Sequence, residues 1–270
     1  MSRTYTTSRY IAHFFKSKRW DSFHSPFLFS LMTHCCNERN VHQSFGAIEK
    51  KRKELINTEE VIERQDYGAG SVSVPKNRSE PISSIARQAL SLPFQCRFLY
   101  RLADFLKPGS IVEFGTSLGI STAYLAICAG DTSVDTIEGD PEIAKTACKV
   151  FESLALQNIR LHNSTFEHFI SGGSLGIAKI DLVFLDGHHT GEALMRYYQA
   201  LKEHIHSKTI IVVDDIYWSA DMTRAWEKLR TLPEVTQSVD CFHFGLLLFN
   251  PDFLHQENHV IRLPFRMLLS

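Results

Sequence analysis

The fold is decided by the stretch Ile111-Val112-Glu113-Phe114-Gly115-Thr116-Ser117-Leu118-Gly119-Ile120-Ser121. An apolar run suited to a buried strand leads into a loop with two glycines, and an apolar helical pattern follows over residues 120–129. Glycines at such a strand-to-helix turn let the backbone approach a ligand closely. The stretch therefore predicts the first strand, the first helix and the ligand-binding edge of an open α/β sheet.

From residue 110 onward, short β-branched runs alternate with helical patterns, which is typical of βα units and a mainly parallel sheet. The five parallel strands are expected at 111–114, 134–138, 159–162, 181–185 and 209–213. The helices between them are expected near 120–129, 141–154, 191–204 and 219–229.

Two further apolar runs, 235–239 and 242–249, are joined by a link too short for a helical crossover. They should form an antiparallel hairpin at the sheet edge. We therefore expect a Rossmann-like α/β fold: an open, mostly parallel seven-stranded sheet with a C-terminal antiparallel hairpin.

The amino-acid pattern before residue 110 is different, with helical patterns at 10–15, 27–35, 47–56 and 82–105. It predicts an N-terminal helical extension. Its first twenty residues contain five cations and no acid, and they run into an apolar helical pattern without a signal-type apolar core. We interpret them as a basic helical arm rather than a transit peptide.

Within the extension, Asp66-Tyr67-Gly68-Ala69-Gly70-Ser71 imitates a glycine-rich cofactor loop. A nucleotide loop needs a buried strand before it and a helix after it. Here polar residues 63–65 precede the glycines and the polar segment 75–78 follows them. We interpret residues 66–71 as a turn or a lid rather than the primary cofactor site.

Composition narrows the class of protein. The chain has 270 residues, 44% hydrophobic and 22% charged, with 29 Lys and Arg against 30 Asp and Glu, which are ordinary globular proportions. The near-zero net charge argues against a broad phosphate-binding surface, so nucleic acid is an unlikely partner. No apolar run reaches the roughly 18 residues of a membrane span. Six cysteines without CxxC spacing are typical of reduced thiols in a cytoplasmic protein.

The chemistry of the loop at 115–121 points away from dinucleotides. It has one glycine fewer than G-x-G-x-x-G, and Glu113 at the strand end would repel a pyrophosphate. Glu113 suits a cationic ligand such as S-adenosylmethionine, whose carboxylate could accept hydrogen bonds from Ser117 and Ser121. Glu138 follows about 20 residues later, at the position from which an acidic side chain binds ribose hydroxyls in Rossmann-type folds.

With this E-x-G-x-x-x-G-x-S loop, the sequence resembles the class I S-adenosylmethionine-dependent methyltransferases, specifically their catechol O-methyltransferase-like branch. The resemblance implies a methyltransferase domain at 108–250, preceded by the extension at 1–107 and followed by a C-terminal tail at 251–270. The alternative is a vacant fold whose glycines only make turns. The cofactor-binding positions that the resemblance implies are Glu113, Gly115, Thr116, Ser117, Gly119, Ser121, Glu138, Gly139, Asn163, Ser164, Asp186 and His188.

Three carboxylates follow two neighbouring strands, at Asp186 and at Asp214-Asp215. Ligands bind at the carboxyl ends of parallel strands, and three close anions repel unless a cation lies among them. Oxygen ligands suit Mg²⁺. The resemblance implies that Asp186, Asp214 and Asp215 form the metal triad of metal-dependent O-methyltransferases.

Methyl transfer from a sulfonium needs a positioned nucleophile that loses its hydroxyl proton. Bound Mg²⁺ would lower the pKa of that hydroxyl, and His189 could accept the proton with Asp186 beside it. His189 stands where catechol methyltransferases have a catalytic lysine. Tyr217 and Trp218 could wall an aromatic substrate. In a purely structural interpretation, Asp215, His188 and His189 only cap the following helices.

The sequence thus predicts an O-methyltransferase of a small hydroxylated, including aromatic, acceptor, assisted by a divalent metal. Two alternatives stay open. One is a tRNA- or RNA-modifying methyltransferase whose basic arm holds phosphates. The other is a non-catalytic S-adenosylmethionine-binding protein with a vestigial acidic edge. A cytoplasmic location and a homodimer are the expected setting.

Overall fold

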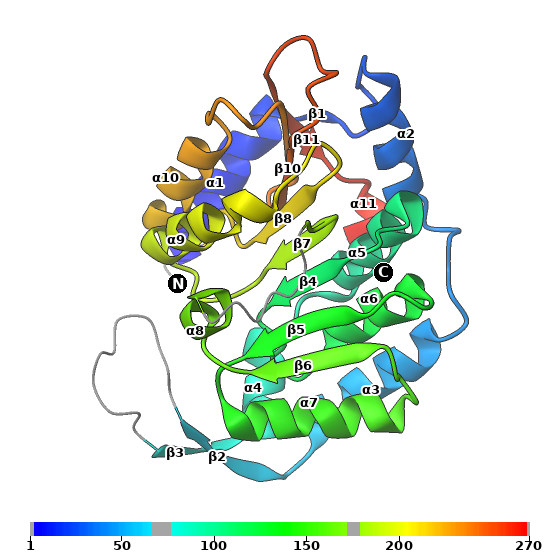
Figure 1. Cartoon of the computed structure of the whole chain (residues 1–270), viewed down its shortest axis with the longest axis vertical. Coiled ribbons are helices and arrows are strands. Elements are labelled where there is room, and N and C mark those ends of the chain that lie inside the picture. The colour runs from blue at the N-terminus through cyan, green and yellow to red at the C-terminus, as the bar shows by residue number, and fades with distance from the viewer. Residues whose placement is uncertain (1–2, 66–76, 172–178, 269–270) are drawn as a thin grey trace.

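The computed structural model describes residues 3–65, 77–171 and 179–268. A large sheet runs through the molecule (Figure 1), and a separate two-stranded hairpin lies beside it. From one edge to the other, the strands of the large sheet are β1 (Lys18–Arg19), β11 (Glu257–Arg262), β9 (Gln237–Asp240), β10 (Phe244–Leu248), β8 (Ile210–Asp214), β7 (Leu182–Leu185), β4 (Ile111–Phe114), β5 (Val134–Glu138) and β6 (Ile159–Asn163).

The five expected parallel strands are confirmed. In the order β8-β7-β4-β5-β6 each pairs in parallel with the next. Every residue of β4, β7 and β8 is buried, as expected of strands covered by helices on both faces. Because the strands are parallel, the loops after β4, β5, β7 and β8 all emerge at the same edge of the sheet.

The antiparallel hairpin of β9 and β10 is confirmed, but its place at the sheet edge is wrong. On its outer side β9 pairs in parallel with β11, and β1 lies beyond β11. The described sheet therefore has nine strands rather than seven. Residues 251–270, expected as a tail, contribute β11. This strand is half-exposed and mostly polar, so it lacks the apolar run that marked the others.

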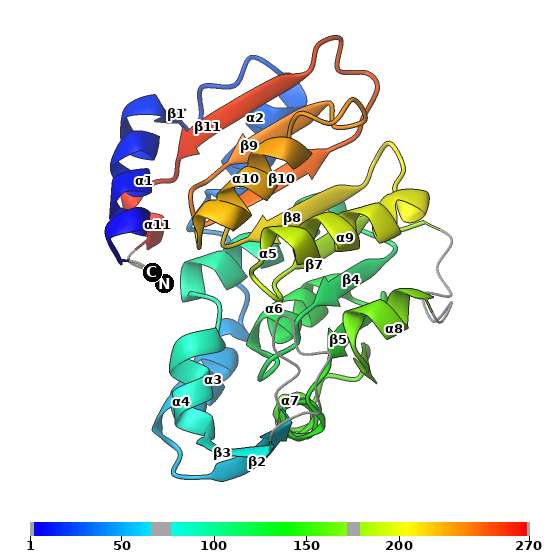
Figure 2. The same cartoon turned by 90° about the vertical axis from the view of Figure 1, so that its left-hand side faces the viewer.

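Helices cover both faces of the sheet (Figures 1 and 2). One face packs against α2 (Pro26–Cys35), α5 (Pro93–Leu106) and α6 (Ile120–Ala129). The other face packs against α8 (Phe166–Ser171), α9 (Gly191–Leu201) and α10 (Ala220–Leu229). A third apolar cluster joins α6 to α3 (Phe45–Asn57), α4 (Ile82–Ala89) and α7 (Pro141–Ser153). Within the described residues no helix combines the length and apolarity of a membrane span.

The helical patterns of the N-terminal extension are confirmed, and the stretch 82–105 divides into α4 and α5. The basic arm is α1 (Arg3–Lys16), which lies along β11. The sequence did not indicate the antiparallel hairpin of β2 (Val61–Gln65) and β3 (Asn77–Pro81). Residues 66–71, expected as a turn or lid, lie outside the described residues. Two short helices complete the chain, η1 (Lys202–His204) and α11 (Phe265–Leu268).

Candidate active site

The loop after β4 depends on two glycines in left-handed backbone conformations, Gly115 (φ +107°) and Gly119 (φ +82°). A Cβ on Gly115 would lie 1.9 Å from the carbonyl oxygen of Asp186, and one on Gly119 would lie 2.5 Å from the Phe151 ring. Both positions therefore exclude side chains. The contact at Gly115 also fixes the loop against the residue that follows β7.

Ser117 lies at the turn of this loop, with φ +47°. Its backbone N–H donates to Glu138 Oε2 at 3.0 Å, and the N–H of Asp140 donates to Glu138 Oε1 at 3.0 Å. Burial raises the pKa of Glu138, despite these two donors. The Ser117 hydroxyl is buried without a hydrogen-bond partner among the described residues, which leaves a polar group available to a ligand.

Glu113 lies beneath the loop rather than in it. Its side chain is fully buried and accepts hydrogen bonds from the hydroxyls of Thr122 and Thr136, the latter at 2.7 Å. The Thr116 hydroxyl lies 2.6 Å from that of Thr136, so Thr116 extends the same network. Burial raises the pKa of Glu113 to about 7, although hydrogen bonds from Thr122, Ser121 and Thr136 lower it. In this conformation Glu113 supports the loop, and its contact with a cationic ligand stays a prediction.

The ends of β5 and β6 bring four of the expected residues together. The amide of Asn163 donates to the carbonyl oxygens of Glu138 (2.9 Å) and Gly139 (3.3 Å), and the N–H of Ser164 donates to the Glu138 carbonyl at 3.0 Å. The side chains and backbone of these residues therefore form one rim beside Ser117, where a nucleoside could lie.

The acidic edge is formed where β7 and β8 end. His189 lies between two carboxylates, with Nε2 3.9 Å from Asp186 Oδ1 and Nδ1 3.7 Å from Asp215 Oδ2. Burial and the nearby Asp215 raise the pKa of Asp186 to about 6, although His189 lowers it. Burial also raises the pKa of Asp214, together with the charges of Asp186 and Asp215. The structure thus brings the three expected acids and His189 to one edge.

The interpretation of Asp215, His188 and His189 as helix caps is wrong. The cap of α9 is Thr190, whose hydroxyl accepts from the N–H of Ala193, and the cap of α10 is Ser219. Asp215 instead has a left-handed backbone (φ +53°) and faces His189. Asp215, His188 and His189 therefore do not cap these helices.

The two adjacent histidines point to different surroundings. His188 forms a hydrogen bond with the Tyr197 hydroxyl and packs edge-on against Phe166, with ring centres 5.3 Å apart. His189 instead packs against Trp218, with ring centres 5.2 Å apart. The ring nitrogen Nδ1 of His188 therefore already has a partner. A role for His188 in cofactor binding stays a prediction.

Trp218 lies where a wall for an aromatic substrate was expected, but Tyr217 does not. The Tyr217 hydroxyl donates to Asp240 Oδ2 at 2.6 Å, and its ring stacks on Phe242 at 5.2 Å. Tyr217 therefore lines a different part of the molecule, described below.

Three residues from the extension reach the site without having been predicted. Ser91 donates to Asp186 Oδ2 at 3.2 Å, and Gln95 of α5 donates to Asp214 Oδ1 at 2.7 Å. Arg64 of β2 bridges Asp140 (3.3 Å) and Glu80 (2.8 Å), which attaches the β2–β3 hairpin beside Glu138. These are tertiary contacts between distant residues, and no local pattern in the sequence marks them.

The expected metal triad does not fit a metal as it is arranged here. Among the described residues, no group of three His, Cys, Asp or Glu side chains is placed to hold a metal ion. Asp214 is turned toward Gln95, and the imidazole of His189 lies between the other two acids. The residue types suit Mg²⁺, but their positions do not.

Comparisons with known proteins agree with this architecture. Residues 112–216 match the family model described as a methyltransferase domain. TomG of Streptomyces achromogenes, an O-methyltransferase involved in tomaymycin synthesis and solved with S-adenosylmethionine, is 22% identical; the match covers 60% of this chain and 82% of TomG, with a TM-score of 0.53. The S-adenosylhomocysteine-bound Podospora anserina methyltransferase PaMTH1 is 14% identical over 84% of this chain and 97% of its own, with a TM-score of 0.55.

Curated relatives cover less of the molecule. The protein-L-isoaspartate O-methyltransferase of Methanocella arvoryzae is 26% identical over 101 residues, which are 37% of this chain and 54% of that protein. The corresponding enzyme of Ignicoccus hospitalis is 26% identical over 128 residues, 42% of this chain and 61% of that protein. The chain thus spans little more than half the length of the curated relatives that it matches.

The fold and the loop together define the class: the chain has the fold of the class I S-adenosylmethionine-dependent methyltransferases, and the resemblance seen in the sequence is confirmed. More particularly, residues 112–216 match the methyltransferase-domain family model, and the structural neighbours of the chain include O-methyltransferases.

Proposed function

We propose that the protein transfers the methyl group of S-adenosylmethionine to the oxygen of a small hydroxylated acceptor. One observation carries the proposal. The backbone of Gly115 in the cofactor loop lies directly against the backbone of Asp186, whose carboxylate faces His189. The methyl-donor loop and a base are therefore adjacent.

The residues of the loop fit the cofactor. The unpartnered Ser117 hydroxyl and the Glu138 carboxylate, held in place by two backbone N–H groups, would bind its polar groups, with Asn163 on the same rim. The cofactor supplies an electrophilic methyl group when bound. The protein contributes a fixed orientation, which lowers the entropic cost of an in-line displacement.

His189 is the proposed general base. It would accept the proton of the acceptor hydroxyl, and Asp186 and Asp215 would stabilise the imidazolium that forms. Gln95 orients Asp214 behind this group, and the Trp218 ring limits the rotation of His189. Trp218 also offers an aromatic face to the acceptor. A base of this kind contributes about 10²–10⁴ in rate.

The assay uses purified full-length protein with S-adenosylmethionine labelled in its methyl group and a panel of hydroxylated small molecules. An isoaspartyl peptide is included because the curated relatives are isoaspartate methyltransferases. His189→Gln should lower kcat by about 10²-fold or more while leaving cofactor affinity near that of the parent. His255→Gln, an exposed histidine away from the site, is the matched control. Equal kcat for His189→Gln and the parent would refute the assigned base.

Divalent metal assistance by Asp186, Asp214 and Asp215 would require these side chains to rearrange, and it is tested separately. Their oxygens are suitable ligands for Mg²⁺, although none of the steps above uses it. Turnover is measured before and after treatment with a chelator and again with added Mg²⁺. Loss of turnover that Mg²⁺ restores supports the metal, and unchanged turnover in chelator removes it.

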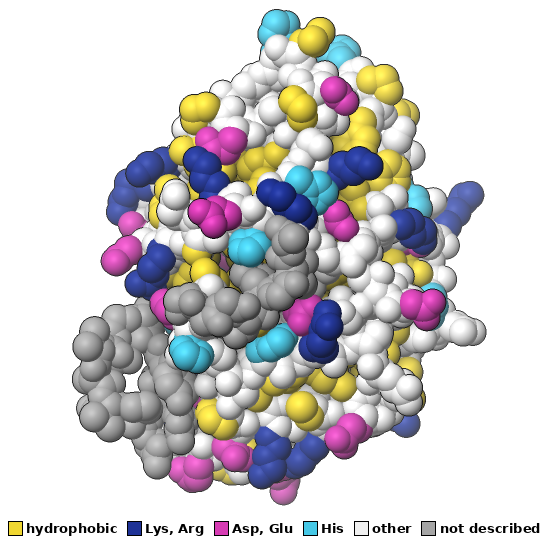
Figure 3. Space-filling model, in the orientation of Figure 1, with side chains coloured by type: hydrophobic (Ala, Val, Ile, Leu, Met, Phe, Trp, Pro, Cys, Tyr) yellow, Lys and Arg dark blue, Asp and Glu magenta, His cyan; other side chains and the backbone are white. Residues whose placement is uncertain are grey.

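The RNA alternative is tested in the same assay with tRNA as acceptor. On the face drawn in Figure 3, cations and carboxylates are interspersed, which does not favour a phosphate-binding surface there. Methylation of tRNA that falls steeply with salt would favour that alternative. Tight cofactor binding with no turnover on any acceptor would favour a non-catalytic binding protein. The cytoplasmic location and the homodimer stay predictions.

A further inference from the structure

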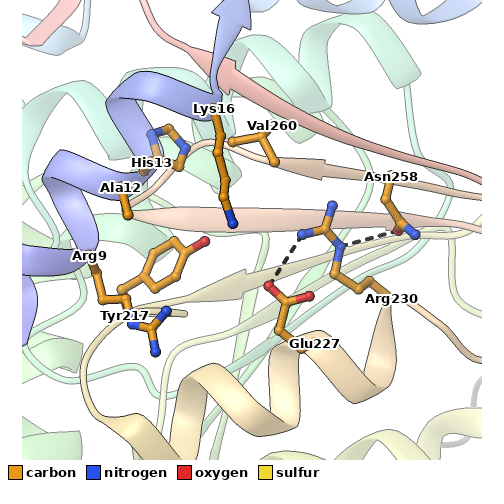
Figure 4. A pocket seen from close by; sticks show the side chains of 9 residues that line it. All are labelled: Arg9, Ala12, His13, Lys16, Tyr217, Glu227, Arg230, Asn258 and Val260. Carbon is orange, nitrogen blue, oxygen red and sulfur yellow. Dashed lines mark hydrogen bonds and ion pairs between the residues drawn. The ribbon is translucent and has the colours of Figure 1, made fainter.

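A cavity of about 290 Å³ opens between α1, α10 and β11 (Figure 4). None of the residues that line it comes from the cofactor loop or the acidic edge. The N-terminal arm is fastened over it, since the Tyr5 hydroxyl of α1 donates to Thr223 of α10 at 2.9 Å. Its volume is close to the roughly 300 Å³ at which small-molecule sites begin.

Among the Lys, Arg, Asp and Glu side chains that line this cavity, cations outnumber carboxylates. Arg9 and Lys16 reach it from α1, and Arg230 reaches it from the end of α10. Figure 4 shows the Lys16 ammonium group and the Arg230 guanidinium pointing into the same space. Glu227 is the one carboxylate among the described residues that line the cavity.

Arg230 is a buried cation that lines the cavity. Its side chain is 7% exposed and its guanidinium lies over the Trp226 ring at 5.6 Å. Its Nε donates to Ser238 and Asn258, both at 3.2 Å. The ion-pair distances of its Nη1 are long, 3.5 Å to Glu227 and 3.7 Å to Asp240. The guanidinium is thus held rigidly, but its charge is incompletely neutralised.

The other charges leave a positive excess. Lys16 forms no ion pair within the part of the chain that the structure describes, and Arg9 donates only to the neutral Tyr5 hydroxyl there, at 3.1 Å. Asp240, beneath the cavity, is already engaged by His13 (3.2 Å) and by the Tyr217 hydroxyl (2.6 Å). The three cations Arg9, Lys16 and Arg230 therefore face two carboxylates. One of these carboxylates, Asp240, already contacts other side chains.

We propose that this cavity binds a small dianionic oxyanion of the phosphate class, either free or carried by an organic molecule. The positively charged guanidinium of Arg230 would attract phosphate oxygens, and the exposed Lys16 adds a mobile point charge. The polar wall and the modest volume suit a compact anion rather than an apolar ligand. This site is separate from the methyl-transfer site and does not depend on its assignment.

The test is calorimetric titration of the full-length protein with inorganic phosphate and with phenyl phosphate. Ionic strength is kept constant with chloride, and S-adenosylhomocysteine is present at saturation to occupy the cofactor site. One saturable site per chain is expected. Binding of both ligands with similar affinity indicates free phosphate, whereas preference for phenyl phosphate indicates an organic phosphate.

Three variants locate the binding. Lys16→Gln should weaken binding by about tenfold, as expected for one charge-assisted hydrogen bond. Glu227→Gln should strengthen it, because the carboxylate that competes for Arg230 is removed. Lys228→Gln, an exposed lysine of α10 that does not line the cavity, should bind like the parent. Lack of saturation, equal losses in Lys16→Gln and Lys228→Gln, or unchanged binding in Glu227→Gln overturns the proposal.

Discussion

At the scale of single residues, Gly115 sets how closely the loop after β4 approaches the acidic edge. Gly115→Ala would place a Cβ 1.9 Å from the Asp186 carbonyl oxygen in a backbone with φ +107°. We expect it to abolish cofactor binding measured by calorimetry and to lower the free energy of unfolding by about 1–3 kcal/mol or more. Gly46→Ala, in α3 with open space around it, should be neutral or stabilising. Parent-like cofactor affinity in Gly115→Ala would contradict the contact.

Glu138 offers a second test at this scale, because its carboxylate is aligned by the N–H groups of Ser117 and Asp140. Glu138→Ala removes both the ribose contact that we predict and this alignment. Affinity for S-adenosylhomocysteine should fall by about 1–3 kcal/mol in calorimetry. Glu152→Ala, an exposed acid at the far end of α7, is the control. Equal affinities would remove Glu138 from the site.

The residues near the loop could be predicted because strand, turn and helix follow one another in the sequence. Ser117 and Glu138 are 21 positions apart and lie in one βαβ unit, so their meeting follows from the fold class. Gln95 and Asp214 are 119 positions apart, and their hydrogen bond depends on how α5 packs across the sheet. Such contacts leave no periodic signal in a single sequence.

At the scale of elements, the buried strands were the most predictable and the polar ones the least. Residues 111–114 and 134–138 were located to the residue because every position of β4 and four of the five in β5 are buried. β11, β2 and β3 carry mostly polar residues. β11 is second from one edge of the large sheet, and β2 and β3 form the separate hairpin. Their formation depends on the neighbouring strand, which local propensity does not report.

Ile261 tests the contribution of β11. It is 2% exposed, belongs to the main apolar core and pairs with Lys18 of β1. Ile261→Ala should lower the free energy of unfolding by about 2–4 kcal/mol in denaturant titration, because a cavity is left beneath the strand. Glu257→Ala, exposed on the same strand, should change it by less than about 0.5 kcal/mol. Similar values for both variants would mean that residues 251–270 are a dispensable tail.

At the scale of the whole molecule, the buried Glu113 makes stability depend on pH. Burial raises its pKa from 4.5 to about 7, so its stabilising contribution is complete below pH 4.5 and is lost as pH rises toward 7. Glu113→Gln removes this loss while keeping an acceptor for Thr122 and Thr136. Between pH 4.5 and 8, the free energy of unfolding of the variant should therefore rise by about 3 kcal/mol relative to that of the parent. Parallel curves for the two proteins would show that Glu113 does not titrate in this range.

The pairing of β1 with β11 has a consequence for biosynthesis. Lys18 lies beside Ile261 in the sheet, although 243 positions separate them. A ribosome adds about 5–20 residues per second, so β1 waits on the order of ten to fifty seconds for its neighbour. During that interval the exposed aromatic side chains of α1, Phe14 and Phe15, lack the strand against which the helix lies. The N-terminal arm is therefore made well before the strand on which it packs, and chaperones have most opportunity to act on it during that interval.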